Sequence, residues 1–97
     1  MAKSFSEFRL EQFDTLNLYT KAIIRAHGEH HPEFQELRST FQNISEKYKQ
    51  DKEADLRPEF EKIRELTNNY QAPDDTCGTV VATFDLLKEA EQLYKNA

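Results

Sequence analysis

The sequence predicts an all-α fold, a compact antiparallel arrangement of four helices with short loops in a single domain, residues 1–97. Apolar residues recur at spacings of three and four in four separate segments, which is the period of an amphipathic helix. Helix start and stop signals separate these segments. No segment alternates apolar and polar residues with a period of two, so the sequence predicts no sheet. A chain of 97 residues has room for one modest hydrophobic core.

The first helix is predicted over residues 4–27. Its start fits a capping box, in which the Ser4 hydroxyl accepts from the backbone N–H of Glu7 and the glutamate side chain returns to Ser4. We expect Gly28 to end this helix in the left-handed conformation. The apolar residues between these signals follow the helical period and are Phe5, Phe8, Phe13, Leu16, Tyr19, Ile23 and Ala26.

The second helix is predicted over residues 32–51. Pro32 suits a first helical turn, where its missing N–H costs little, and Glu33 and Glu36 are placed favourably for the helix dipole. An amphipathic stripe follows, and we expect most of its surface to be buried. The stripe consists of Phe34, Leu37, Phe41, Ile44 and Tyr48.

The third and fourth helices are predicted over residues 56–70 and 74–95. Asp55 and Pro58 mark the start of the third, and Pro73 is available to begin the fourth after a segment of turn residues. The apolar face of the third helix is Phe60, Ile63, Leu66 and Tyr70. The buried side of the fourth is expected to be Val80, Val81, Phe84, Leu87, Ala90, Leu93 and Tyr94.

The net charge of −5 lies entirely in the second half of the chain. Residues 1–50 carry seven basic and seven acidic side chains, whereas residues 51–97 carry six and eleven. An acidic chain without a basic stripe is a poor candidate for binding nucleic acid or an anionic membrane. The sequence has no apolar run of about 20 residues and no signal-peptide region, and a single cysteine cannot close an intramolecular disulfide. We therefore expect a soluble, cytoplasmic protein.

All three histidines lie in AHGEHHPEF, residues 26–34, which is either a metal site or the corner between two helices. Helical iron sites pair a histidine with a carboxylate three residues before it or four after it, and no carboxylate occupies those positions here. We favour the corner. His27 would then lie in the last turn of a helix, where a protonated imidazole stabilises the dipole by roughly 0.3 to 1 kcal/mol. His30 and His31 would be solvated, with His31 available to cap the second helix. A metal site at His27, His30 and His31 stays an alternative.

Cys77 has two interpretations. It is either a thiol activated near a helix N-terminus or a small buried side chain, and we favour burial because Asp74 and Asp75 would oppose thiolate formation. The sequence shows no Ser/His/Asp or Cys/His arrangement at a recognisable spacing, no glycine-rich phosphate loop and no obvious acid–base pair. It therefore predicts no enzyme.

Two segments together resemble a known family. They are HGEHHPEF, residues 27–34, and IRELTNNY, residues 63–70, with Pro73 and Cys77 following. They are similar to the repair-of-iron-centres (RIC) proteins, hemerythrin-like di-iron proteins linked to the restoration of iron–sulfur clusters after oxidative or nitrosative damage. The family pattern runs HGExHPEL, then LTNxYxxPxxAC, then a helix like residues 79–95. The likeness extends over about residues 20–94 and implies a hemerythrin-like bundle.

The chain departs from the family pattern where iron would bind. RIC proteins hold two irons through histidines and glutamates spread over four helices, and we do not count the histidine matched by His27 among the main ligands. No histidine occurs near Ser6, where the first-helix ligand would fall. The motif HMxxEExxLFP is matched only by residues 48–58, which lack its histidine. The segment with the third ligand histidine is deleted or merged into the third helix. The sequence reaches Ala97 about where the last ligand helix would supply its final histidine and glutamate.

Three functions remain open. The first is a non-catalytic, ligand-stripped relative of RIC proteins that assists iron-centre repair or a stress response through a protein partner or as a homodimer. The second is a low-coordination iron-binding protein that uses His27, His30 and His31. The third is a general helical interaction module that dimerises through an exposed apolar face. We expect no cofactor, because the resemblance implies iron but the main ligands are missing.

Overall fold

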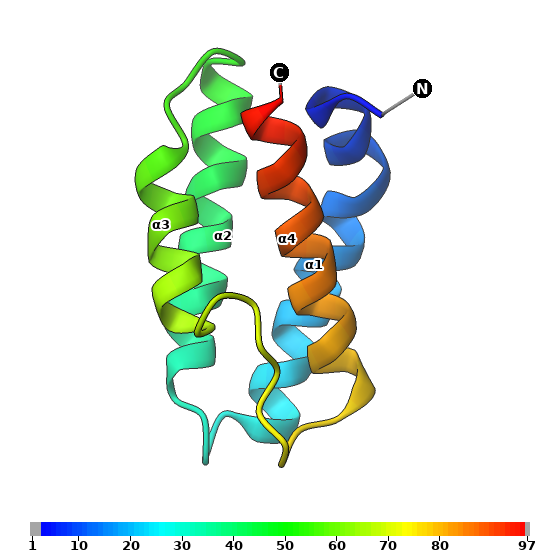
Figure 1. Cartoon of the computed structure of the whole chain (residues 1–97), viewed down its shortest axis with the longest axis vertical. Coiled ribbons are helices and arrows are strands. Elements are labelled where there is room, and N and C mark those ends of the chain that lie inside the picture. The colour runs from blue at the N-terminus through cyan, green and yellow to red at the C-terminus, as the bar shows by residue number, and fades with distance from the viewer. Residues whose placement is uncertain (1–2, 97) are drawn as a thin grey trace.

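The computed structural model describes residues 3–96 as a bundle of four helices. These are α1 (Phe5–His27), α2 (Glu33–Gln50), α3 (Arg57–Leu66) and α4 (Gly78–Lys95), and no strand occurs in residues 3–96. Successive helices run in opposite directions (Figure 1). The predicted all-α, antiparallel four-helix arrangement is confirmed. None of the helices in this range combines the length and the apolar character needed to cross a membrane.

The two ends of the bundle are formed by different segments of the chain. One end, here called the histidine pole, contains the α1–α2 corner, residues 27–33, and the end of the α3–α4 loop, residues 71–77. The other end, here called the terminal pole, contains the start of α1, the α2–α3 turn and the end of α4, so both ends of the described range, residues 3 and 96, lie there (Figure 1).

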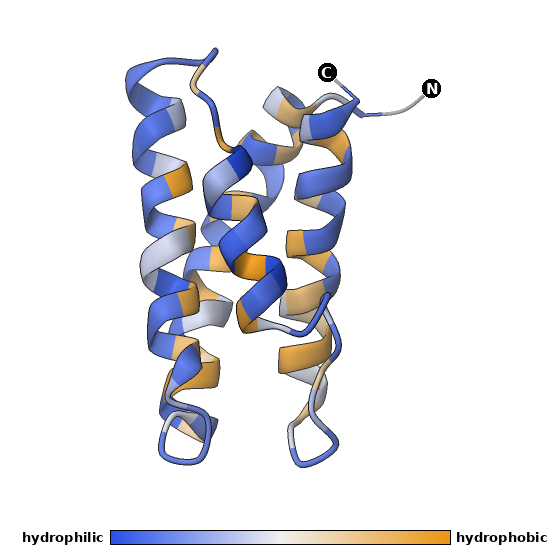
Figure 2. Ribbon diagram, turned by 60° about the vertical axis from the view of Figure 1, so that its left-hand side comes forward, coloured by the Kyte–Doolittle hydropathy of each residue, from blue (hydrophilic) through white to orange (hydrophobic). Residues whose placement is uncertain are grey.

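The predicted start of α1 and the predicted stripe of α2 are both confirmed. The backbone N–H of Glu7 donates to the Ser4 hydroxyl at 3.1 Å, and the glutamate side chain returns to the Ser4 backbone. Every residue of the α2 stripe from Phe34 to Tyr48 is buried. Figure 2 shows hydrophobic residues recurring along each helix between longer hydrophilic stretches, as expected for amphipathic helices.

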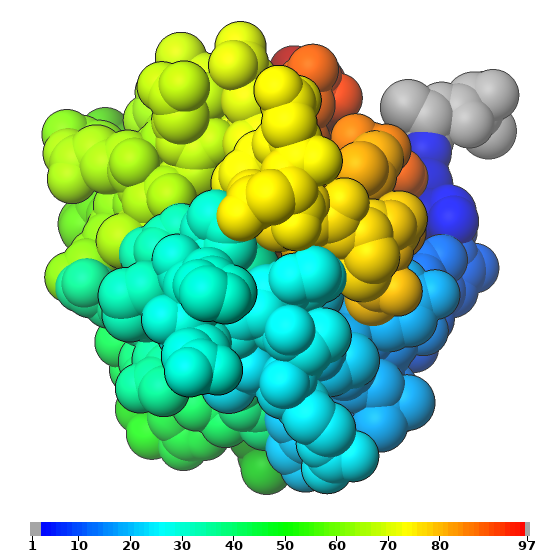
Figure 3. Space-filling model, turned by 90° about the horizontal axis from the view of Figure 1, so that it is seen from below, coloured from blue at the N-terminus to red at the C-terminus, as the bar shows by residue number. Residues whose placement is uncertain are grey.

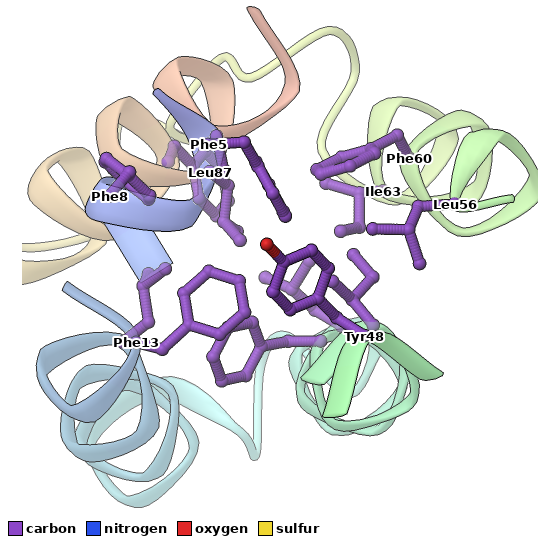
Figure 4. Packing of buried hydrophobic residues seen from close by; sticks show 14 of the residues in the cluster. Phe5, Phe8, Phe13, Tyr48, Leu56, Phe60, Ile63 and Leu87 are labelled. Carbon is purple, nitrogen blue, oxygen red and sulfur yellow. The ribbon is translucent and has the colours of Figure 1, made fainter. Parts of the chain in front are cut away.

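The core contains buried apolar side chains from all four helices and from Leu56 before α3 (Figure 4). Helix α1 packs against α2 and α4, and α2 packs against α3, whereas α3 and α4 approach each other less closely. Phe5 lies edge-on to the rings of Tyr48 and Tyr94, with centroid distances of 5.2 and 5.7 Å. Aromatic side chains therefore bring three helices together at the terminal pole.

Some predicted core positions are less buried than expected. Ala26 is exposed and Val81 is 46% exposed, because each lies on the solvent side of its helix, with Val81 one residue past the fully buried Val80. Five other predicted core residues are only partly buried, namely Tyr19, Leu66, Tyr70, Leu93 and Tyr94.

Helix α3 ends at Leu66 and not at Tyr70, so the predicted end was wrong. The Thr67 hydroxyl donates to the Ile63 carbonyl at 2.7 Å and accepts from the Tyr70 N–H at 2.9 Å. The three residues after Thr67 have φ angles of 51°, 61° and 65°, in the left-handed region. This turn interrupts the helix although Tyr70 continues the apolar spacing of four.

Helix α4 begins at Gly78 and not near residue 74. Pro73 begins a turn in place of the predicted helix, and the N–H and the hydroxyl of Thr76 both donate to the Pro73 carbonyl. Cys77 follows in an extended conformation, with φ −92° and ψ 174°, and is the N-cap residue of α4. The helix cannot start earlier because the backbone of its N-cap is extended.

Candidate functional site

The corner between α1 and α2 is a tight, hydrogen-bonded turn. The N–H groups of His30 and His31 both donate to the His27 carbonyl, at 3.1 and 2.8 Å. Gly28 has φ −61° and ψ −26°, so the predicted left-handed stop was wrong. A Cβ atom at this position would lie 2.5 Å from the Ile24 carbonyl oxygen. The corner therefore favours glycine because the backbone approaches closely.

His31 connects this corner to the α3–α4 loop. Its Nδ1 lies 3.0 Å from a carboxylate oxygen of Glu33, and its Nε2 lies 3.0 Å from both carboxylate oxygens of Asp75, 44 residues away. The ring stacks on Phe34 at 5.1 Å between centroids. Figure 3 shows the corner and the loop side by side on the histidine pole. The prediction that His31 is merely solvated was wrong, because its side chain is only 13% exposed.

The two carboxylates favour the protonated form of His31. Both ring nitrogens face acceptors, and only an imidazolium donates from both. Glu33 first and Asp75 second raise the pKa of His31. In return, the hydrogen bond to His31 lowers the pKa of Asp75. The three side chains form a charged contact that holds the loop against the corner.

Cys77 is exposed, so the prediction of a buried thiol was wrong. Its backbone N–H donates to His27 Nε2 at 3.4 Å, across 50 residues of sequence. A hydrogen bond with the His27 side chain, and then the N–H groups of Val80 and Thr79 in the first turn of α4, lower the pKa of the thiol to about 7. The carboxylate of Asp75, which was expected to oppose ionisation, is held by His31.

His27 lies in the last turn of α1, as predicted, but the structure gives its ring a partner that was not predicted. An unprotonated Nε2 accepts the Cys77 N–H, whereas a protonated one is suited to donate to a thiolate. The His27 ring therefore lies beside Cys77 at the start of α4. No local spacing indicated this pairing, because the two residues belong to different segments.

Each of the three histidines has different surroundings. His27 lies against Cys77, His31 lies between Glu33 and Asp75, and His30 is exposed on the turn. Within residues 3–96, no group of three or more histidine, cysteine, aspartate or glutamate side chains has an arrangement that could hold a metal ion.

No protein-family model matches this chain, and no curated protein or solved structure matches it significantly. The similarity to RIC proteins therefore stays a prediction that depends on the two motifs. These motifs are the segments that meet at the histidine pole, where His31 contacts Asp75 and His27 contacts Cys77.

The interior of the bundle does not fit a di-iron centre. Such a centre needs several inward-facing histidines and carboxylates. Within residues 3–96, the largest fully buried side chains are apolar, among them Phe8, Leu37, Ile63 and Phe84. The buried polar side chains in this range are four threonines and Glu91, so the interior has a single carboxylate and no histidine. The histidines lie outside this interior, at one end of the bundle.

Within residues 3–96, Glu91 on α4 is the one buried charged side chain. It accepts a hydrogen bond from the Tyr70 hydroxyl at 2.6 Å and lies 3.3 Å from Arg64 Nε and 3.4 Å from Lys95 Nζ. Burial, and then Glu91 itself, raises the pKa of Tyr70. Tyr70 therefore remains a donor, and the left-handed turn after α3 is attached to α4 by this bond. No local sequence signal identified Glu91, because it resembles the other acidic residues of α4.

Proposed function

We propose that this protein is a non-catalytic, cytoplasmic relative of RIC proteins that assists iron-centre repair or a stress response through a protein partner. The observation that carries the proposal is the contact between the two family-like segments at the histidine pole. His31 and His27 from the first segment contact Asp75 and Cys77 from the second. Segments that recur together in a family are expected to form one structural unit, and here they do.

Two features support action through a partner. Among the described residues, the interior holds no histidine and one carboxylate, Glu91, which is too few ligands for a di-iron centre. The outer surface carries large apolar side chains on the adjacent helices α1 and α4, where Leu10, Leu18 and Val81 are 72%, 64% and 46% exposed. In this proposal a partner covers these three side chains. The partner in this proposal is a second protein or a second copy of the chain.

A cluster-repair assay tests the proposal. A dehydratase whose exposed [4Fe–4S] cluster has been damaged by peroxide is incubated anaerobically with ferrous iron, a thiol reductant and a di-iron RIC protein, with or without this chain. We expect this chain to increase the rate of reactivation when the RIC protein is present and to have no effect without it. Reactivation by the chain alone, or no effect in either mixture, would contradict the proposal.

A matched pair of variants connects the assay to the histidine pole. Asp75→Asn removes the carboxylate that contacts His31, whereas Asp74→Asn makes the same change at an exposed neighbour. We expect the first variant to lose most of the effect and the second to retain it. Equal activity of the two variants would show that the pole is not the surface that acts.

A further inference from the structure

A groove of about 770 Å³ opens at the terminal pole, away from the histidines. Its lining includes Phe5 at the start of α1, Tyr48 near the end of α2 and Tyr94 near the end of α4. The Tyr94 hydroxyl accepts the backbone N–H of Leu56 at 2.9 Å, which fixes this ring between α3 and α4. The aromatic walls are therefore held in place by packing and by a hydrogen bond, as in sites that bind small molecules.

The charge at the groove has the opposite sign to the charge of the chain. The lining contains Lys52, Arg57 and Lys95 but only one acidic side chain, Glu53, whereas the whole chain has a net charge of −5. Asp55 contacts the Arg57 guanidinium at 2.9 and 3.0 Å and offsets part of its charge. Lys95 lies 3.4 Å from Glu91, which Arg64 also contacts at 3.3 Å, so Glu91 offsets only part of the Lys95 charge. Lys52 forms no ion pair within residues 3–96 and contributes its full charge at the mouth. Such a positive field favours a negatively charged ligand.

We infer that this groove binds a small amphipathic anion, a carboxylate or sulfonate carried on an aromatic or aliphatic body. The body lies against Phe5, Tyr48 and Tyr94, and the acid group faces Lys52 and Lys95. The volume lies within the range of about 300 to 1,000 Å³ that is usual for small-molecule sites. This site lies at the opposite end of the bundle from the histidine pole, so the inference does not depend on the proposed function.

Titration of the full chain with anilinonaphthalene sulfonate, an aromatic anion that fluoresces when bound, tests the inference. We expect saturable binding of one probe per chain, displacement by decanoate, and clearly weaker binding of phenylnaphthylamine, which has the same rings without the sulfonate. Lys52→Glu should raise the Kd about tenfold, because it replaces an attractive charge with a repulsive one at the mouth. Lys49→Glu, the same change at an exposed position of α2 outside the lining, should change it by less than about twofold.

Amide shifts in NMR spectra locate the probe, and circular dichroism checks that each variant is folded. We expect the shifts to cluster at residues 4–6, 52–57 and 94–95. Shifts centred on the exposed Leu10 and Leu18 would overturn the assignment, as would equal binding of the charged and uncharged probes. A probe signal that falls as the protein concentration rises would mean that a second copy fills the groove, and that result also overturns it.

Discussion

The interior of the bundle and the histidine pole are stabilised by different forces. The interior consists mainly of apolar side chains from every helix, and burying each large one contributes about 1.5 to 3 kcal/mol. The pole depends on His31 between two carboxylates and on Cys77 beside His27, where solvent weakens each contact. The interior thus determines whether the chain folds, whereas the pole determines how two distant segments are positioned. The pole can change with pH while the bundle remains folded.

The largest effects are expected in the interior. Leu37→Ala or Phe41→Ala should lower the free energy of unfolding by about 2 to 5 kcal/mol, because each substitution leaves a cavity. Leu37 is fully buried and Phe41 is 2% exposed. Denaturant titration measures the change. Leu18→Ala, at a position 64% exposed, is the control and should change the value by less than about 0.5 kcal/mol. A change that small for Leu37→Ala would contradict its place in the core.

The two glycines are expected to respond in opposite directions. Gly28→Ala should lower the free energy of unfolding by about 1 to 3 kcal/mol, because its Cβ would lie 2.5 Å from the Ile24 carbonyl oxygen. Gly78 has no neighbouring atom within 4 Å of an added Cβ, so Gly78→Ala should raise the free energy by about 0.4 to 1 kcal/mol. Thermal unfolding of the two variants compares the corner with the start of α4. Identical shifts would show that the corner tolerates a side chain.

The His31 contact should make stability depend on pH. Because folding raises the pKa of His31, its stabilisation is complete below pH 6.5 and is lost as the pH rises through the raised value. Folding lowers the pKa of Asp75. The contribution of Asp75 to stability is therefore present above pH 3.8 and is lost as the pH falls through the lowered pKa. The difference in Tm between the wild type and His31→Gln should therefore be largest between these limits. His30→Gln, at an exposed position, should show no such dependence. A difference that stays constant with pH would contradict the charged contact.

Changes at the contact between His27 and Cys77 should have the smallest effect on stability. Their clearest effect is expected on the reactivity of the Cys77 thiol. The rate of alkylation of the folded protein should rise with pH with a midpoint of about 7. His27→Ala should move this midpoint upward, because it removes the main group that lowers the thiol pKa, while His30→Ala should leave it unchanged. Slow alkylation that requires unfolding would instead support a buried thiol.

Periodicity and capping signals were sufficient to predict the bundle. The apolar residues from Phe34 to Tyr48 follow the helical period and are all buried on one face of α2. The capping box at Ser4 fixes the start of α1. Local rules were wrong where two signals competed. Tyr70 continues the apolar spacing of α3, but the Thr67 hydroxyl and a left-handed turn end the helix first. Pro73 is suited to a helix start, but the chain needs a further turn before α4.

The candidate site was less predictable because its contacts connect distant residues. Asp75 lies 44 residues from His31, and Cys77 lies 50 residues from His27, so no spacing rule relates them. The histidine stretch was recognised as a helix corner, but the partners of its side chains were not. The only sequence signal that connected the two segments was their joint similarity to one family.

Measurement of bound iron tests most directly whether this bundle lacks the di-iron chemistry of the proteins it resembles. The protein is purified without an affinity tag, refolded anaerobically with ferrous iron, desalted for metal analysis and then exposed to air. We predict no stoichiometric loading of two irons and no oxo-bridged absorption, because the buried interior of residues 3–96 has no histidine and only one carboxylate, Glu91. Weak binding of one ion at the corner would be compatible with this result, and His27→Ala combined with His31→Ala should abolish it. Two tightly held irons per chain would contradict the prediction and show that the family resemblance extends to the metal centre.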